Sequence, residues 1–123
     1  MSEEQKTDEQ KAVDQIRAVY EDGKAEINGR TYTFGKMQHK NRRKVFAFFT
    51  KVQGDINAKS FWFLESPEFE QVEEIIHSHT LFNGDKLSNI DNHWDKYPGD
   101  YITFVSTALA VISYPFMDAA ITG

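Results

Sequence analysis

Two Asn-Gly dipeptides constrain the fold most, because each one marks a tight turn at a defined place in the chain. Asn28-Gly29 lies in the segment KAEINGRTYTF, and Asn83-Gly84 lies in LFNGDKLS. Asn and Gly both accept positive φ values, which the type I′ turn of a β-hairpin requires. The sequence therefore predicts two short hairpins. The flanking residues do not align beyond the turns, which favours ordinary turn chemistry over an internal repeat.

Apolar residues recur at helical spacing on either side of the first turn. The pattern predicts a helix from Asp8 to about residue 21, and a second helix from Met37 to about Gln53 that Gly54 ends. The second helix has the strongest apolar stripe: Val45, Phe48, Phe49, Val52 and Ile56.

Prolines mark the other helix boundaries. Ser66 and Pro67 predict the N-cap and first residue of a third helix. Pro98 predicts the start of a last helix, which runs to about residue 114 and ends at Pro115. The segment 55–65, which contains FWFL, is predicted as a short strand or an aromatic plug, and residues 89–99 as a loop or short helix.

The chain of 123 residues suits one domain with a modest core. The predicted fold is mainly α, of the α+β kind, with about four helices and one or two short β-hairpins in a single domain. Residues 1–7 are expected to form a disordered N-terminal tail, residues 8–116 the helix-rich domain, and residues 117–123 a C-terminal tail. The apolar stretch 101–116 contains Thr and Ser, and it is expected to be too short and too polar to span a bilayer.

Residue types and spacings indicate no catalytic residue, cofactor or metal site. The chain has no Cys, which excludes disulfides, thiolate nucleophiles and Cys-based zinc sites. His77 and His79 are two residues apart on a predicted helix, so their side chains diverge and are not expected to share a metal. Neither a Gly-rich phosphate loop nor a nucleophile elbow is present. An enzyme of an unrecognised type remains an alternative.

Two predicted helices carry opposite charges. The basic residues of the second helix region are Lys36, Lys40, Arg42, Arg43 and Lys44, and the acidic residues of the third helix are Glu68, Glu70, Glu73 and Glu74. The basic segment has three interpretations: a solvated helix face, a surface for an acidic protein, or a nucleic-acid site, which the formal net charge of −5 disfavours. Opposed charged faces would allow head-to-tail self-association. If the two helices pack side by side in one chain, that argument fails.

Several apolar side chains are candidates for a docking surface. Phe46 lies off the main stripe of its helix, and with Phe61 or Phe63 it could be exposed. Ile102 and Val111 lie outside the main apolar face of the last helix. A helix that is apolar nearly all round is either central to the core or part of an interface.

Five segments resemble the tail assembly chaperones of long, non-contractile tailed phages and prophages. They are INGRxYxF, KMxHKxRRKVFAFF, WFLxSPEF, HWxxYPxDY and ALAVISYPF, which together run from Ile27 to Phe116. The resemblance implies a mostly helical, self-associating, non-enzymatic protein of the host bacterial cytoplasm. Such a protein binds the tape measure protein, keeps it soluble, and is absent from the mature virion.

The same resemblance implies two products. This chain would be the short one, and a programmed frameshift would give a longer one whose extension meets the tail tube protein. The alternative prediction is a small nucleic-acid-binding regulator that uses the basic segment 36–44.

Overall fold

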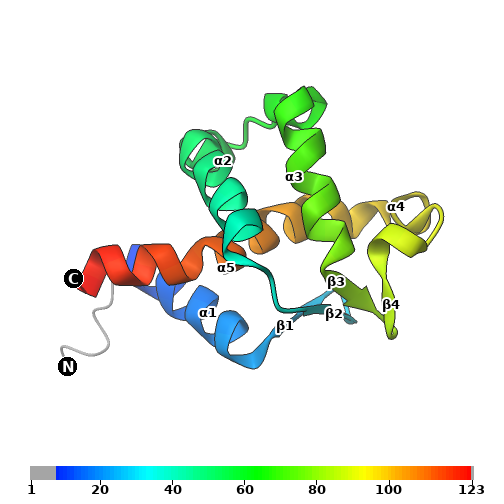
Figure 1. The fold of residues 1–123 in the computed structure, drawn as a ribbon, viewed down its shortest axis with the longest axis horizontal. Coiled ribbons are helices and arrows are strands. Elements are labelled where there is room, and N and C mark those ends of the chain that lie inside the picture. Colours follow the sequence, from blue (N-terminus) through cyan, green and yellow to red (C-terminus); the bar gives the residue numbers. More distant parts are fainter. Residues whose placement is uncertain (1–7, 123) are drawn as a thin grey trace.

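The computed structural model describes residues 8–122, which form five α-helices and one small antiparallel sheet (Figure 1). This confirms the predicted fold class, mainly α with some β; the predicted tail at residues 1–7 lies outside the described residues. The helices are α1 (Asp8–Asp22), α2 (His39–Asn57), α3 (Pro67–Ser78), α4 (His93–Lys96) and α5 (Tyr101–Thr122). The strands are β1 (Lys24–Ile27), β2 (Arg30–Phe34), β3 (Thr80–Phe82) and β4 (Asp85–Lys86). Within residues 8–122 there are also three 3-10 turns: η2 (Trp62–Glu65), η3 (Leu87–Asn89) and η4 (Pro98–Asp100).

Both predicted hairpins are confirmed, and they join into one sheet. The Asn residues have φ values of 51° and 53°, and the Gly residues that follow have 81° and 84°, as two-residue turns with positive φ require. β2 pairs antiparallel with β3, so the strand order is β1-β2-β3-β4. The helices α2 and α3 are inserted between the two hairpins, and the sequence did not indicate that the hairpins would pair.

The helix α2 ends later than predicted. Gly54 lies inside it, and the helix continues to Asn57. Ile56 keeps the apolar stripe going for another turn, since it packs against the core. Lys59, whose φ is 62°, adopts the left-handed conformation that terminates the helix. The prediction that Gly54 ends the helix was therefore wrong, because packing outweighs the low helix propensity of one Gly.

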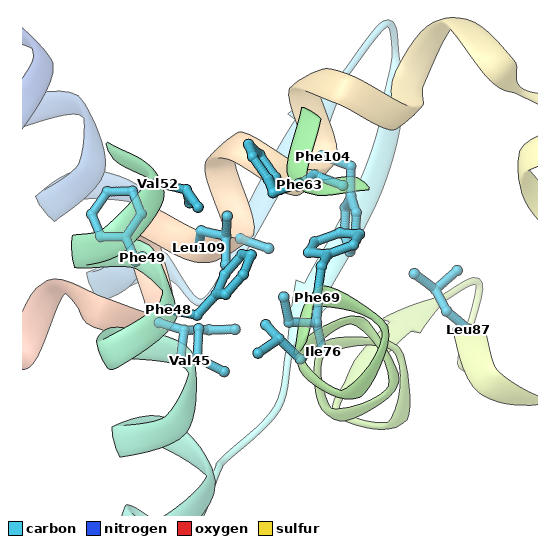
Figure 2. Packing of buried hydrophobic residues seen from close by; sticks show 14 of the residues in the cluster. Val45, Phe48, Phe49, Val52, Phe63, Phe69, Ile76, Leu87, Phe104 and Leu109 are labelled. Carbon is cyan, nitrogen blue, oxygen red and sulfur yellow. The ribbon is translucent and has the colours of Figure 1, made fainter. Parts of the chain in front are cut away.

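The predicted start of α3 is confirmed, and the segment before it is an aromatic plug rather than a strand. The Ser66 hydroxyl accepts a hydrogen bond from the Phe69 backbone N–H at 3.1 Å, and Pro67 is the first helical residue. In η2, the Phe63 ring is fully buried between Phe48 and Phe69, with ring centroids 5.6 Å from each (Figure 2). This plug holds α2 and α3 together.

The helix α5 also extends beyond its prediction. Pro115 was expected to end it, but the helix continues to Thr122, so residues 117–122 are helical rather than a tail. Pro115 has no N–H, and the carbonyl of Val111 therefore lacks its usual helical donor. The adjacent Ile112 carbonyl accepts a bond from Arg42 of α2 at 2.7 Å. This bond ties α5 to α2 beside the proline.

The helix α5 is central to the core. The 20-residue segment Pro98–Met117, which comprises η4 and most of α5, has a mean hydropathy of 1.2, and by length and composition it is apolar enough to cross a membrane. The expectation that the stretch is too short was therefore wrong. Half of the segment is buried inside the protein, against α1 and α2 among others. A buried core helix has the same composition, so this is weak evidence for a membrane span.

Replacing Ser113 by Ala is expected to leave the free energy of unfolding unchanged or to raise it by up to about 1 kcal/mol. The Ser113 side chain is fully buried in α5, and its hydroxyl has no hydrogen-bond partner within residues 8–122. Urea unfolding would measure the change. Thr80→Val is the matched control: it removes a buried hydroxyl that does donate, to the Ile76 carbonyl at 2.8 Å, and should lose about 1 kcal/mol. A loss of that size in the Ser113 variant would contradict the prediction.

Candidate functional site

A groove of about 780 Å³ lies between α1, α2 and α5. Both α1 and α2 pack on α5 (Figure 1). Residues of α5 form the floor of the groove. The residues that line the groove are mostly apolar: Ala12, Val13 and Ile16 of α1, Phe49, Gln53, Ile56 and Asn57 of α2, and Ser106, Ala110, Tyr114 and Met117 of α5. The groove is thus an apolar channel with helices on three sides.

Small residues on the floor create the hollow. Ser106, Ala110 and Tyr114 are four residues apart and lie on one face of α5. The short side chains of the first two leave the space that Val13 and Phe49 border from either side. The small-residue spacing was the available sequence signal for this groove, and the sequence analysis missed it because the relative placement of the three helices was not predicted.

The wall formed by α1 packs on α5 through half-buried and exposed side chains. None of its side chains between residues 10 and 22 is buried. The Arg17 Nε donates to the Tyr114 hydroxyl at 2.8 Å, and the Tyr20 ring lies 5.2 Å from the Tyr114 ring. One edge of α1 is therefore attached to α5, while its apolar stripe faces the groove.

A buried polar network lies at the other end of α5. The Asp100 carboxylate is fully buried and accepts hydrogen bonds from Arg30 Nε at 2.6 Å and Nη2 at 2.9 Å, from Asn28 Nδ2 at 2.7 Å, and from the Tyr32 hydroxyl at 2.8 Å. The Arg30 guanidinium also stacks over the Tyr97 ring, 4.2 Å from its centroid. The network joins the first hairpin to the start of α5.

The network fixes the charge of Asp100 and the proton position on His93. Hydrogen bonding to Arg30 holds the pKa of Asp100 well below its usual value, despite the opposing effect of burial. Burial and the bond to Asp100 raise the pKa of Tyr32. Because an ionised carboxylate only accepts, the Tyr32 hydroxyl must donate to it and can only accept from His93 Nε2, 2.9 Å away. His93 therefore carries its proton on Nε2.

A hydrogen bond from Trp94 fixes the protonation state of the other histidine, His77. The Trp94 indole N–H donates to His77 Nε2 at 3.2 Å, and an indole nitrogen can only donate. His77 must therefore have a lone pair on Nε2. Both histidines line a small cavity of about 200 Å³ with Trp94 and Asp95. The hydrogen bond from Trp94 therefore favours the neutral form of the His77 imidazole.

Lowering the pH below about 6.5 is expected to reduce stability by at most about 1.4 kcal/mol per pH unit for each of two histidines. Burial lowers the pKa of His77, although the negative charge of Glu73 opposes this shift. Burial also lowers the pKa of His93, although the negative charge of Asp100 opposes it. As the pH falls, these histidines bind protons in the unfolded chain before they do so in the folded protein. The stabilisation that the two neutral histidines provide is therefore fully present above the pKa of histidine in the unfolded chain, and it is lost as the pH falls below that value. The urea midpoint, measured from neutral to mildly acidic pH, reports the loss.

The variant His77→Gln is the matched control for this pH dependence. The Gln carbonyl oxygen can accept the Trp94 N–H bond but cannot be protonated in this range. Asp100 does not titrate here, because its pKa is depressed far below mildly acidic pH. The variant should show a shallower decline of the midpoint with falling pH. An unchanged decline would contradict the assignment to His77.

The basic residues predicted as a site are divided between surface and interior contacts. Lys36, Lys40, Arg43 and Lys44 are exposed. Arg42 is half-buried and donates to the Ile112 carbonyl of α5, so it has a structural role. Four of the five residues therefore form an exposed basic surface at the start of α2.

The acidic residues lie on α3, a helix that packs against α2 within the same chain. α2 and α3 pack side by side, with the Phe48 and Phe69 rings 5.7 Å apart. Glu68 accepts a bond from Lys51 of α2 at 2.7 Å, and Glu73 accepts one from the Tyr101 hydroxyl. The remaining two members of the acidic set are exposed: Glu70 and Glu74. The charge argument for head-to-tail association therefore fails on the condition stated for it.

The predicted apolar docking residues differ in their exposure to solvent. Val111 is only 3% exposed and Phe63 is fully buried, so neither offers a docking surface. They are buried because α5 is covered on more than one side and because Phe63 is the plug between α2 and α3. Phe46 is half-buried against Phe116, with ring centroids 4.9 Å apart. Ile102 is 37% exposed and remains a surface residue.

No group of three or more His, Cys, Asp or Glu side chains that could hold a metal occurs in the described part of the chain. The chain matches no protein-family model, no curated protein and no solved structure. The groove between α1, α2 and α5 is thus the feature from which a function can best be argued.

Proposed function

We propose that this chain is a non-enzymatic tail assembly chaperone that binds the tape measure protein and keeps it soluble while the tail tube is assembled. The observation that carries the proposal is the apolar groove of about 780 Å³ between α1, α2 and α5. A protein that keeps an apolar client in solution must cover apolar surface of that client. The groove supplies such a surface, and the resemblance of segments between Ile27 and Phe116 supplies the client.

The groove suits an amphipathic helix of the client. Helices accept a partner helix when an apolar channel meets the partner's apolar side, with anchors at positions i, i+3, i+4 and i+7. Ser106 and Ala110 let a partner side chain enter deeply, and Gln53 and Asn57 offer amide groups among the lining residues. Repeated weak contacts of this kind fit a long client better than one deep pocket.

The wider proposal follows the resemblance. The chain acts in the host bacterial cytoplasm, self-associates while bound to the client, and does not stay in the mature virion. A longer frameshifted form recruits the tail tube protein. No cofactor takes part.

The test is a single substitution in the floor of the groove. Ala110→Trp should fill the hollow and weaken binding of the tape measure protein at least tenfold. The Trp side chain would occupy the space that an apolar side chain of the client fills. Ala47→Trp is the matched control: it adds the same side chain at an exposed position of α2 outside the groove. The measurement is the soluble fraction of co-expressed tape measure protein, with the affinity of the purified pair. Circular dichroism checks that both variants fold.

The outcomes separate the alternatives. If Ala110→Trp folds and keeps the client soluble as well as Ala47→Trp does, the groove is not the binding site. If neither variant nor the parent chain affects the client, the chaperone function itself is wrong. The four exposed basic residues in and just before the first turns of α2 favour one alternative, a nucleic-acid-binding regulator. A mobility shift that is lost steeply with added salt and abolished by Arg43→Glu would support that alternative.

A further inference from the structure

The two Asn-Gly turns have the same backbone conformation but different surroundings. Asn28 Nδ2 donates to the Asp100 carboxylate at 2.7 Å and to the Gly99 carbonyl at 3.4 Å. Asn83 is exposed, and no hydrogen bond holds its side chain among the residues that the structure describes. One side-chain amide is thus held by the core of the protein, and the other is free to rotate in solvent.

We propose that Asn83 is a site of spontaneous deamidation in the folded protein, and that the Asp100 network protects Asn28 from the same reaction. In this reaction the backbone nitrogen of Gly84 attacks Cγ of Asn83. A new N–C bond forms, the bond from Cγ to Nδ2 breaks, and the amide proton leaves with the side-chain nitrogen as ammonia. Water then opens the cyclic imide to give aspartate or isoaspartate. Water is the only co-reactant, and nothing is oxidised or reduced.

Access to the attacking nitrogen favours this site. Gly84 has no side chain, and a Cβ placed there would meet no atom within 4 Å, so the space around it is open. A two-residue hairpin turn closes through the flanking residues, here Phe82 and Asp85, and does not use the N–H of its second turn residue. The other Asn residues of the chain precede Arg, Ala, Ile or His. These side chains hinder attack by the following backbone nitrogen.

At Asn28 the same attack is opposed by the network. The side-chain carbon must rotate toward Gly29, which breaks the charge-assisted bond to Asp100. The cost of breaking such a bond predicts a reaction at least tenfold slower than at Asn83. Unfolding removes the protection, and Asn28 then reacts as freely as Asn83.

The two products have different consequences. Deamidation at Asn83 adds a negative charge to an exposed turn beside Asp85, and the core does not touch it. Deamidation at Asn28 replaces a hydrogen-bond donor to the buried carboxylate of Asp100 by a second carboxylate, and the two like charges repel each other. A chain that has unfolded and reacted at Asn28 therefore rebuilds the network less favourably.

The experiment is an incubation in mildly alkaline buffer, followed by peptide mapping with mass spectrometry. In native buffer, conversion at Asn83 should exceed that at Asn28 at least tenfold. In urea above the unfolding transition, the two sites should react at similar rates. Similar rates at both sites in native buffer, or slower reaction at Asn83, would overturn the proposal.

Two variants complete the test. Asn83→Asp should stop most of the mass gain of the folded protein while leaving its urea midpoint unchanged, since Asp tolerates the positive φ of this turn. Asn28→Asp should lower the midpoint sharply. Continued mass gain in the Asn83 variant at the rate of the parent chain would show that the reactive site lies elsewhere. This inference does not depend on the chaperone function.

Discussion

Asp100→Asn is expected to lower the free energy of unfolding by about 3 kcal/mol. The carboxylate accepts four hydrogen bonds, two from Arg30 and one each from Asn28 and Tyr32. A carboxamide has the same shape, but its NH2 group is a hydrogen-bond donor. This group would face the N–H or O–H donors that the carboxylate now binds. Partial exposure of Arg30, at 32%, lets water relieve part of the cost, which keeps the loss at the lower end for a broken buried pair.

Urea unfolding of Asp100→Asn would be compared with that of Asp85→Asn. The control makes the same change at an exposed carboxylate of β4, where the expected effect is within about 0.5 kcal/mol. Losses of equal size in the two variants would mean that the Asp100 network does not stabilise the fold.

Phe63→Ala is expected to cost about 3 to 5 kcal/mol. The ring is fully buried between Phe48 of α2 and Phe69 of α3, so its removal leaves a cavity where the two helices meet (Figure 2). A domain of this size has only about 5 to 15 kcal/mol of stability in total, and the variant should be close to unfolding. Urea unfolding and near-ultraviolet circular dichroism would detect the loss.

The adjacent residue provides the control. Trp62 is larger than Phe63 but 57% exposed, and Trp62→Ala should cost less than about 1 kcal/mol. A reversed order of the two losses would place Phe63 on the surface and Trp62 in the core.

Local chemistry in this sequence predicted local structure well. The Asn-Gly turns, the Ser66 cap and the stripe of α2 each depend on a few neighbouring residues, and each was confirmed. The errors occurred where tertiary contacts of the helix decided the outcome. Pro115 does not end α5, where Arg42 bonds the Ile112 carbonyl, and Gly54 does not end α2, because Ile56 packs against the core.

The candidate site was harder to predict than the fold. The groove depends on how α1, α2 and α5 are placed, and the buried network depends on the pairing of Arg30 with Asp100, 70 residues apart. Sequence periodicity contains no information on either. Arg42 was assigned to a charged surface for the same reason, since its partner is a backbone carbonyl of another helix.

The pairing of the two hairpins bears on the order in which the chain folds. Each hairpin closes a two-residue turn and can form early and alone, whereas Phe34 pairs with Thr80 only after the intervening helices have been brought together. Within the sheet, only the ladder between β2 and β3 pairs residues that are far apart in the sequence. Docking of α2 and α3 around the Phe63 plug shortens the effective loop that this ladder must close. We therefore expect the two helices to pack together before the two hairpins pair.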